Sequence, residues 1–172
     1  MMITENALIC LIAMSEIVYA FGGHIGPRME YDARLETCVE IAAAAEEEDL
    51  PVSLVVSLAK EESGFTRALV SKAGAHGPLQ IIPRYHCPSK HGVVAPHKRA
   101  GRLEGCDLIT DGVRAVKWFR DTYAHDWPKA LCHWNSGTTC LRDARAFAHR
   151  VIHRHRRIET QLRALLTLEA QR

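Results

Sequence analysis

The sequence lacks a strong net charge. Its 22 Lys and Arg residues barely outnumber its 20 Asp and Glu residues, which gives a formal net charge of +2 at pH 7. A protein that binds nucleic acid mainly through its overall electrostatic field carries a clear positive excess. The composition therefore excludes this class of protein for the molecule as a whole, and we expect no nucleic-acid partner.

Internal repeats, low-complexity tracts and strong strand patterns are also absent. Apolar residues recur at helical spacing instead, first in a helix predicted from Asp32 to Asp49 and last in a long C-terminal helix. Residues 66–109 lack long apolar periods and are predicted to form loops. A chain of 172 residues is expected to form one domain. We therefore predict a mainly α-helical single domain, with Trp118 and Phe119 in its core.

The N-terminus has no apolar run of the ~20 residues that a membrane-spanning helix needs. Residues 7–14 have the length of a signal-peptide core, and residues 18–20 resemble a cleavage site. The preceding flank carries Glu5 and neither Lys nor Arg, which is atypical of a signal peptide. We predict that residues 1–31 are a possible signal or leader segment with a linker, before a domain at 32–172. The alternative is an extra amphipathic helix packed on that domain.

A candidate general acid stands at the end of an apolar helical run. The helix is predicted to begin at Pro51, to continue from Val52 to Glu62 and to stop at Gly64. A carboxyl that emerges from the core at the floor of a groove is poorly solvated, so its pKa rises from about 4.3 towards roughly 6 or above. Glu62 would then protonate a glycosidic oxygen near neutral pH. The alternative is an ordinary solvated carboxylate at a helix end.

Two further motifs follow this helix in the chain. Residues 74–80 read Gly-Ala-His-Gly-Pro-Leu-Gln, and residues 134–137 read Trp-Asn-Ser-Gly. Together with Glu62-Ser63-Gly64-Phe65, and in this order, they resemble the motifs of the lytic transglycosylases of the SLT family, which cleave the glycan strands of bacterial peptidoglycan. The resemblance covers residues 32 to about 140. It implies that Glu62 is the single catalytic acid and base.

The resemblance also implies a set of substrate-binding residues. Amides can donate to and accept from amino sugars, a hydroxyl can contact the substrate or orient the glutamate, and glycines let the backbone approach the glycan. The residues concerned are Ser63, Gly74, Gly77, Gln80, Trp134 and Asn135. The family has a tyrosine where Trp134 stands, and that tyrosine is thought to orient the glutamate through its hydroxyl. An indole lacks this oxygen, so the role of Trp134 is left open.

The implied fold is a lysozyme-like single domain with a substrate groove. The implied reaction is cleavage of the β-1,4 bond between N-acetylmuramic acid (MurNAc) and N-acetylglucosamine (GlcNAc), leaving 1,6-anhydro-MurNAc ends and using no cofactor or metal. Its place would be the periplasm or the cell exterior, and a phage-encoded origin is open. One alternative is a hydrolytic muramidase that uses Asp107 or Asp111 as a second acid. Another is a peptidoglycan-binding component without activity. Oligomeric state is not indicated.

Six cysteines add an expectation about disulfides. Cys132 and Cys140 closely flank the Trp-Asn-Ser-Gly turn, and Cys87 and Cys106 bracket a loop, so we hypothesise that each pair is bonded. Free thiols are the alternative. A zinc site is a further hypothesis, although the spacing fits no compact Cys/His pattern. Its ligands would be His86, Cys87, His91, His97 and Cys106.

The C-terminal helix carries a basic band. Its members are Arg142, Arg145, His149, Arg150, His153, Arg154, His155, Arg156 and Arg157. Such a band is usually a solvated helix face. The functional alternative is weak attraction to the anionic cell envelope.

Overall fold

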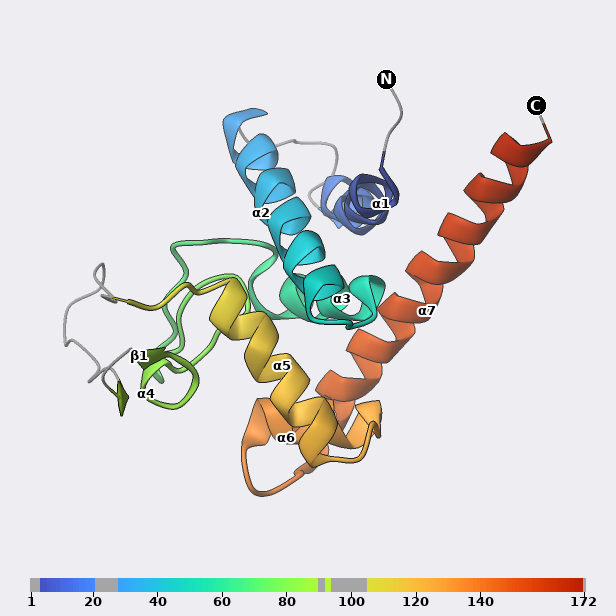
Figure 1. The fold of residues 1–172 in the computed structure, drawn as a ribbon. Coiled ribbons are helices and arrows are strands. Elements are labelled where there is room, and N and C mark those ends of the chain that lie inside the picture. Colours follow the sequence, from blue (N-terminus) through green and yellow to red (C-terminus); the bar gives the residue numbers. More distant parts are fainter. Residues whose placement is uncertain (1–3, 21–27, 90–91, 94–104, 172) are drawn as a thin grey trace.

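The structure is a computed structural model, and it describes residues 4–20, 28–89, 92–93 and 105–171, without the side chains of 16–20, 28–29, 88–89 and 92–93. The described chain is mainly helical and forms one domain, as predicted (Figure 1). The elements are α1 (Glu5–Ala20), α2 (Arg28–Glu47), α3 (Val52–Ser63), α4 (Pro83–His86), β1 (Pro88–Ser89), β2 (Gly92–Val93), α5 (Thr110–Thr122), α6 (Trp127–Ser136) and α7 (Arg142–Ala170). β1 pairs antiparallel with β2.

Helix α3 is the centre of the domain. Seven consecutive residues, Ser53 to Ala59, are buried, and the helix contacts α1, α2 and α7 (Figure 1). Pro51 precedes its first turn, and Gly64 ends it in the left-handed region, with a φ of 58°. Glycine reaches this conformation at little cost, so the predicted stop at Gly64 is confirmed. The apolar run thus carries the end of α3 out of the core at a defined residue.

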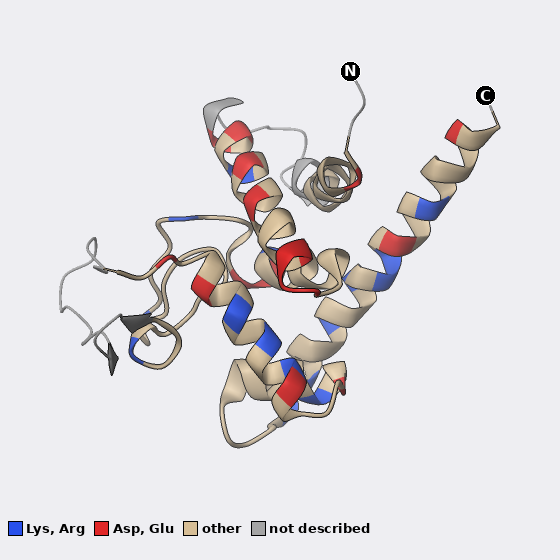
Figure 2. Ribbon diagram, viewed as in Figure 1, with Lys and Arg blue, Asp and Glu red and all other residues tan. Residues whose placement is uncertain are grey.

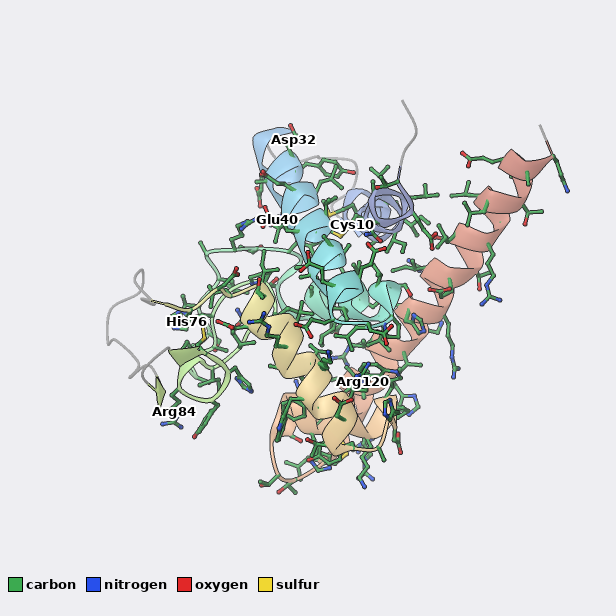
Figure 3. The ribbon with its side chains drawn as sticks, viewed as in Figure 1. Cys10, Asp32, Glu40, His76, Arg84 and Arg120 are labelled. Carbon is green, nitrogen blue, oxygen red and sulfur yellow. A yellow bond between two sulfur atoms is a disulfide. The ribbon has the colours of Figure 1, made fainter. Side chains whose placement is uncertain are left out.

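Helix α1 packs on the domain instead of standing apart from it. Ile9, Cys10, Ala13 and Met14 are buried in the core, and α1 contacts α2, α3 and α7. A disulfide joins Cys10 to Cys38 in α2 (Figure 3). This arrangement agrees with the alternative that the segment is an extra helix packed on the domain. Removal of the segment as a leader stays a prediction.

The start of α2 differs from the predicted one. Helix α2 begins at Arg28 rather than Asp32, so the predicted linker was too long at its C-terminal end.

Asp107 caps the start of α5. Its Oδ1 accepts the backbone N–H groups of Ile109 and Thr110 at 3.0 and 3.1 Å. An Asp side chain is a strong cap wherever amides of the first turn face it.

Both predicted disulfides are present. Cys87 pairs with Cys106 between α4 and α5, and Cys132 pairs with Cys140 between α6 and α7. Asp111 lies near the first pair, but a cysteine in a disulfide offers no thiolate to a metal. The zinc hypothesis therefore loses two ligands. Its other members, His91 and His97, lie outside the described residues.

Helix α7 is 29 residues long and packs through its N-terminal two thirds. Its buried residues are Ala144, Phe147, Ala148, Val151, Ile158 and Leu162. Leu165 and Leu166, near the C-terminal end, are exposed, because the helix extends past the rest of the domain (Figure 1). Basic residues lie along α7, and acidic residues are frequent along α2 (Figure 2). Within the described residues, no helix is both long and apolar enough to cross a membrane.

Candidate active site

Glu62 lies in the last turn of α3 and is held by Trp134 from α6. The indole Nε1 donates a hydrogen bond to Glu62 Oε1 at 2.7 Å. The sequence left the role of Trp134 open, because an indole has no hydroxyl oxygen. The indole N–H nevertheless reaches the carboxyl, so Trp134 fixes the position of the Glu62 side chain by donating this hydrogen bond.

The environment of Glu62 favours its protonated form. Burial raises the pKa of this carboxyl, the hydrogen bond from Trp134 opposes the rise, and the charge of Glu61 adds to it, with a net pKa of about 7. Glu62 therefore holds its proton in about half of the molecules at neutral pH. A carboxyl in this state can both give and take a proton.

The environment of the adjacent Glu61 favours its ionised form. Burial alone would raise its pKa, but hydrogen bonds from Arg150 and Arg154 of α7 outweigh this effect and lower it. Arg154 Nη1 lies 2.9 Å from Oε2, and Arg150 binds Oε1. Glu61 therefore stays ionised and is occupied by two guanidinium groups. Two neighbouring carboxyls in such different environments take different roles, and only Glu62 is suited to proton transfer.

Ser63 connects α3 to the glycine-containing loop. Its hydroxyl donates to the backbone carbonyl of Pro78 at 2.7 Å, and the same oxygen accepts the N–H of Thr66 at 3.2 Å. The sequence suggested that Ser63 contacts the substrate or orients Glu62. Its hydrogen bonds hold this loop beside the end of α3. A contact between Ser63 and the substrate stays a prediction.

Gln80 stabilises the same loop. Its Nε2 donates to the carbonyls of Gly77 and Leu69 at 2.8 and 3.1 Å, which uses both amide hydrogens inside the protein. The side-chain oxygen Oε1 is the group of Gln80 that remains to meet a sugar. A role for Gln80 in substrate binding stays a prediction and is limited to accepting hydrogen bonds.

The two glycines of the loop differ in what surrounds them. Both have a positive φ, but a Cβ added at Gly74 meets nothing within 4 Å, whereas one at Gly77 would lie 2.9 Å from Leu108 Cδ1. The space beside Gly77 is therefore filled by Leu108. The close approach of the backbone to the glycan at Gly74 and Gly77 stays a prediction. The sequence reasoning also missed Gly112 in α5, where a Cβ would lie 2.8 Å from Leu79 Cδ1. An isolated glycine next to apolar residues at helical spacing was the available signal.

We expect Gly77→Ala to lower the free energy of unfolding by about 2–4 kcal/mol, because backbone strain at positive φ adds to a clash with Leu108. Gly74→Ala is the matched control, since it carries only the strain of its φ of 80°, and we expect it to cost about 1 kcal/mol. Urea unfolding of the two variants measures the difference. Equal losses would contradict the assignment of Gly77 to packing.

A pocket of about 800 Å³ lies between α4, α5 and α6 and has Trp134 in its wall. Its other lining residues are Ile82, Tyr85, His86, Asp111, Arg114, Ala115, Trp118, Phe119, His133, Asn135, Ser136 and Gly137. Trp118 was predicted to lie in the core, but it is 59% exposed and lines this pocket. Asn135 is exposed at the same pocket, where its amide can meet a ligand.

The site therefore combines a buried carboxyl that titrates near neutral pH, a donor that fixes it and a neighbouring pocket rich in aromatic residues. Among known protein families, the transglycosylase SLT domain matches residues 40–154, which is more than half of the chain and includes Glu62, the glycine-containing loop and Trp134. No solved structure gives a significant match. On the extent of the family match, the chain belongs to the SLT transglycosylase domain family, whose members act on peptidoglycan and share the lysozyme-like fold.

Proposed function

We propose that this protein is a peptidoglycan lytic transglycosylase. It cleaves the β-1,4 bond between MurNAc and GlcNAc, leaves 1,6-anhydro-MurNAc ends and uses Glu62 as its only acid and base. The observation that carries this proposal is the state of Glu62, whose pKa burial raises to about 7 while Trp134 holds one of its oxygens. One carboxyl that is half protonated at neutral pH can serve both proton transfers of the reaction.

In the first step Glu62 acts as the acid. The indole N–H of Trp134 can donate but not accept, so Oε1 is the acceptor of that bond and the proton of the neutral acid sits on Oε2. Oε2 gives this proton to the glycosidic oxygen. The bond between that oxygen and C1 of MurNAc breaks, and the GlcNAc end leaves as an alcohol.

In the second step Glu62 acts as the base. The 6-hydroxyl of the same MurNAc attacks C1, and its proton passes to Oε2, which restores the starting acid. The substrate N-acetyl group stabilises the positive charge that develops at C1. One C–O bond breaks and one forms, so no water is consumed.

A hydrolytic muramidase with a second carboxyl is the main alternative. Asp107 is a poor candidate, because its oxygens cap the start of α5. Asp111 is the better one, since it lines the pocket and burial raises the pKa of its carboxyl. Its Oδ2 accepts the backbone N–H of Asp107 at 3.0 Å, which ties that oxygen to the loop before α5. A component that binds glycan without cleaving it is the remaining alternative.

Mass spectrometry of the products separates these functions. A lytic transglycosylase leaves MurNAc ends that are lighter by one water than the reducing ends left by a hydrolase. We expect anhydro ends from the unmodified protein and also from Asp111→Asn, because the proposed reaction needs no second carboxyl. Reducing ends, lost in Asp111→Asn, would establish the muramidase. Intact peptidoglycan after prolonged incubation would favour the binding component.

The substrate places the proposed activity in the periplasm or outside the cell. Weak attraction to the anionic envelope through α7 is part of this proposal, and a pocket of about 410 Å³ among His149, Arg150, His153, Arg154 and Arg157 lies on that helix. Two of these arginines bind Glu61, so the band presents less net charge than its sequence indicates. Fractionation of cells that express a tagged protein tests the location. Recovery only with the cytoplasm would contradict it.

A further inference from the structure

We propose that Trp118 and Tyr85 are stacking platforms for the glycan, at the two ends of a chain of aromatic rings that passes through Trp134. This inference rests on the proposed function and adds the path that the strand takes past Glu62. On this path, sugars of the strand lie along the pocket between α4, α5 and α6.

The rings form a continuous series across the pocket. Tyr85 contacts His86 with ring centroids 6.3 Å apart, and His86 stacks on Trp134 at 6.0 Å. On the other side, Trp134 contacts Phe119 at 5.4 Å, and Phe119 contacts Trp118 at 5.0 Å. The middle ring of the series is the one that donates to Glu62. A ligand that follows the rings therefore passes the ring that holds the reacting carboxyl.

The two end rings are the exposed ones. Tyr85 is 65% exposed and Trp118 is 59% exposed, whereas His86, Phe119 and Trp134 are partly buried. Single exposed apolar residues are ordinary on a protein surface. Here both exposed rings line one pocket, and packing against other rings restricts the motion of each. Rings held in place in this way lose little conformational entropy when they cover a ligand.

The chemistry of the pocket fits the ring faces and acetamido groups of an amino-sugar chain. Burial lowers the pKa of His86, which favours an uncharged ring between Tyr85 and Trp134 at neutral pH. Arg114 is already paired, with Nε 3.1 Å from Glu48 Oε1. The ring faces suit the apolar C–H faces of sugars, and the amide of Asn135 suits acetamido groups. Sites of this kind typically combine apolar walls with a few placed polar groups.

The test measures binding in a Glu62→Gln background, where the ligand is not consumed. Peptide-free strands of alternating GlcNAc and MurNAc are titrated by calorimetry against this parent and against further substitutions. We expect Trp118→Ala and Tyr85→Ala each to weaken binding by roughly three- to tenfold, and Trp118→Phe by less, since it keeps a ring. Leu141→Ala is the matched control, because Leu141 is also 59% exposed but does not line the pocket.

In the active protein, Trp118→Ala should raise KM and leave kcat nearly unchanged, because Trp118 contacts Glu62 only through two other rings. Binding that is the same in Trp118→Ala, Tyr85→Ala and Leu141→Ala would overturn the inference while leaving cleavage, and so the proposed function, intact. Absence of binding by the parent would overturn the inference as well. The proposed function is tested separately, by whether the unmodified protein forms anhydro products.

Discussion

Glu62→Gln is expected to reduce the cleavage rate by about 10³- to 10⁴-fold, at the upper end of what general acid–base catalysis contributes, because one group serves both proton transfers. The substitution keeps the size of the side chain and an oxygen that accepts the hydrogen bond from Trp134. It removes only the proton that is transferred. The rate is measured as release of soluble fragments from purified peptidoglycan.

The same variant is expected to be more stable than the unmodified protein at neutral and alkaline pH. The folded-state pKa of Glu62, about 7, lies above its ordinary value of 4.5, so the folded state binds this proton more tightly than the unfolded state does. The stability that this provides is complete below pH 4.5 and is lost as the pH rises through 7. Gln does not titrate, so Glu62→Gln should gain roughly 3 kcal/mol over the unmodified protein by pH 8.

The two readouts together separate a catalytic loss from misfolding. An inactive variant that is also less stable at pH 8 would point to a structural defect. A variant that digests peptidoglycan at the unmodified rate would overturn the proposed mechanism. Glu61→Gln is not a suitable control, because it would leave Arg150 and Arg154 without their shared partner.

Trp134→Phe has the second largest expected effect. It removes the N–H that binds Oε1 of Glu62 and keeps an aromatic ring in the pocket wall. A hydrogen bond to a charged group contributes about 1.5–3 kcal/mol, so we expect kcat to fall roughly 10- to 100-fold. The bond from Trp134 lowers the pKa of Glu62, so its loss should raise that pKa further and move the alkaline limb of the pH profile upward.

Trp134→Tyr is expected to keep most of the activity, since a phenol hydroxyl donates as an indole N–H does and is the group found at this position in the family. Trp127→Phe is the control, because Trp127 lies outside the pocket lining and contacts the core. A pH profile that does not move in Trp134→Phe would mean that the hydrogen bond has no influence on Glu62. A dead Trp134→Tyr variant with an intact fold would contradict the equivalence of the two donors.

The sequence was sufficient to predict the features that depend on local pattern. The apolar run from Leu54 to Ala59 and the stop at Gly64 place Glu62 at the end of a buried helix, and the structure has this arrangement. Local pattern does not reveal which distant side chain meets a given group. The bond between Trp134 and Glu62 joins residues 72 positions apart, so the sequence could raise the question of the donor but could not answer it.

Other features of the structure also depend on contacts that the local pattern does not reveal. Cys10 stands in an apolar run that resembles a leader, and only tertiary packing brings it to Cys38. Gly77 belongs to a motif that the resemblance associates with the groove. The space beside it is filled by Leu108, which comes from a segment without a helical pattern. Trp118 was predicted to lie in the core but is exposed and lines the pocket. In each case the surroundings of the residue depend on tertiary packing, which the local sequence pattern does not show.

The central claim is that Glu62 keeps its proton near neutral pH while its neighbour does not. NMR titration of the isotope-labelled glutamate carboxyl carbons, with Glu62→Gln to assign the signal, measures this directly. We predict a midpoint near pH 7 for Glu62 and a midpoint below 4.5 for Glu61. A Glu62 carboxyl that titrates at its ordinary value of 4.5 would contradict the account, because such a group holds almost no proton to donate at neutral pH.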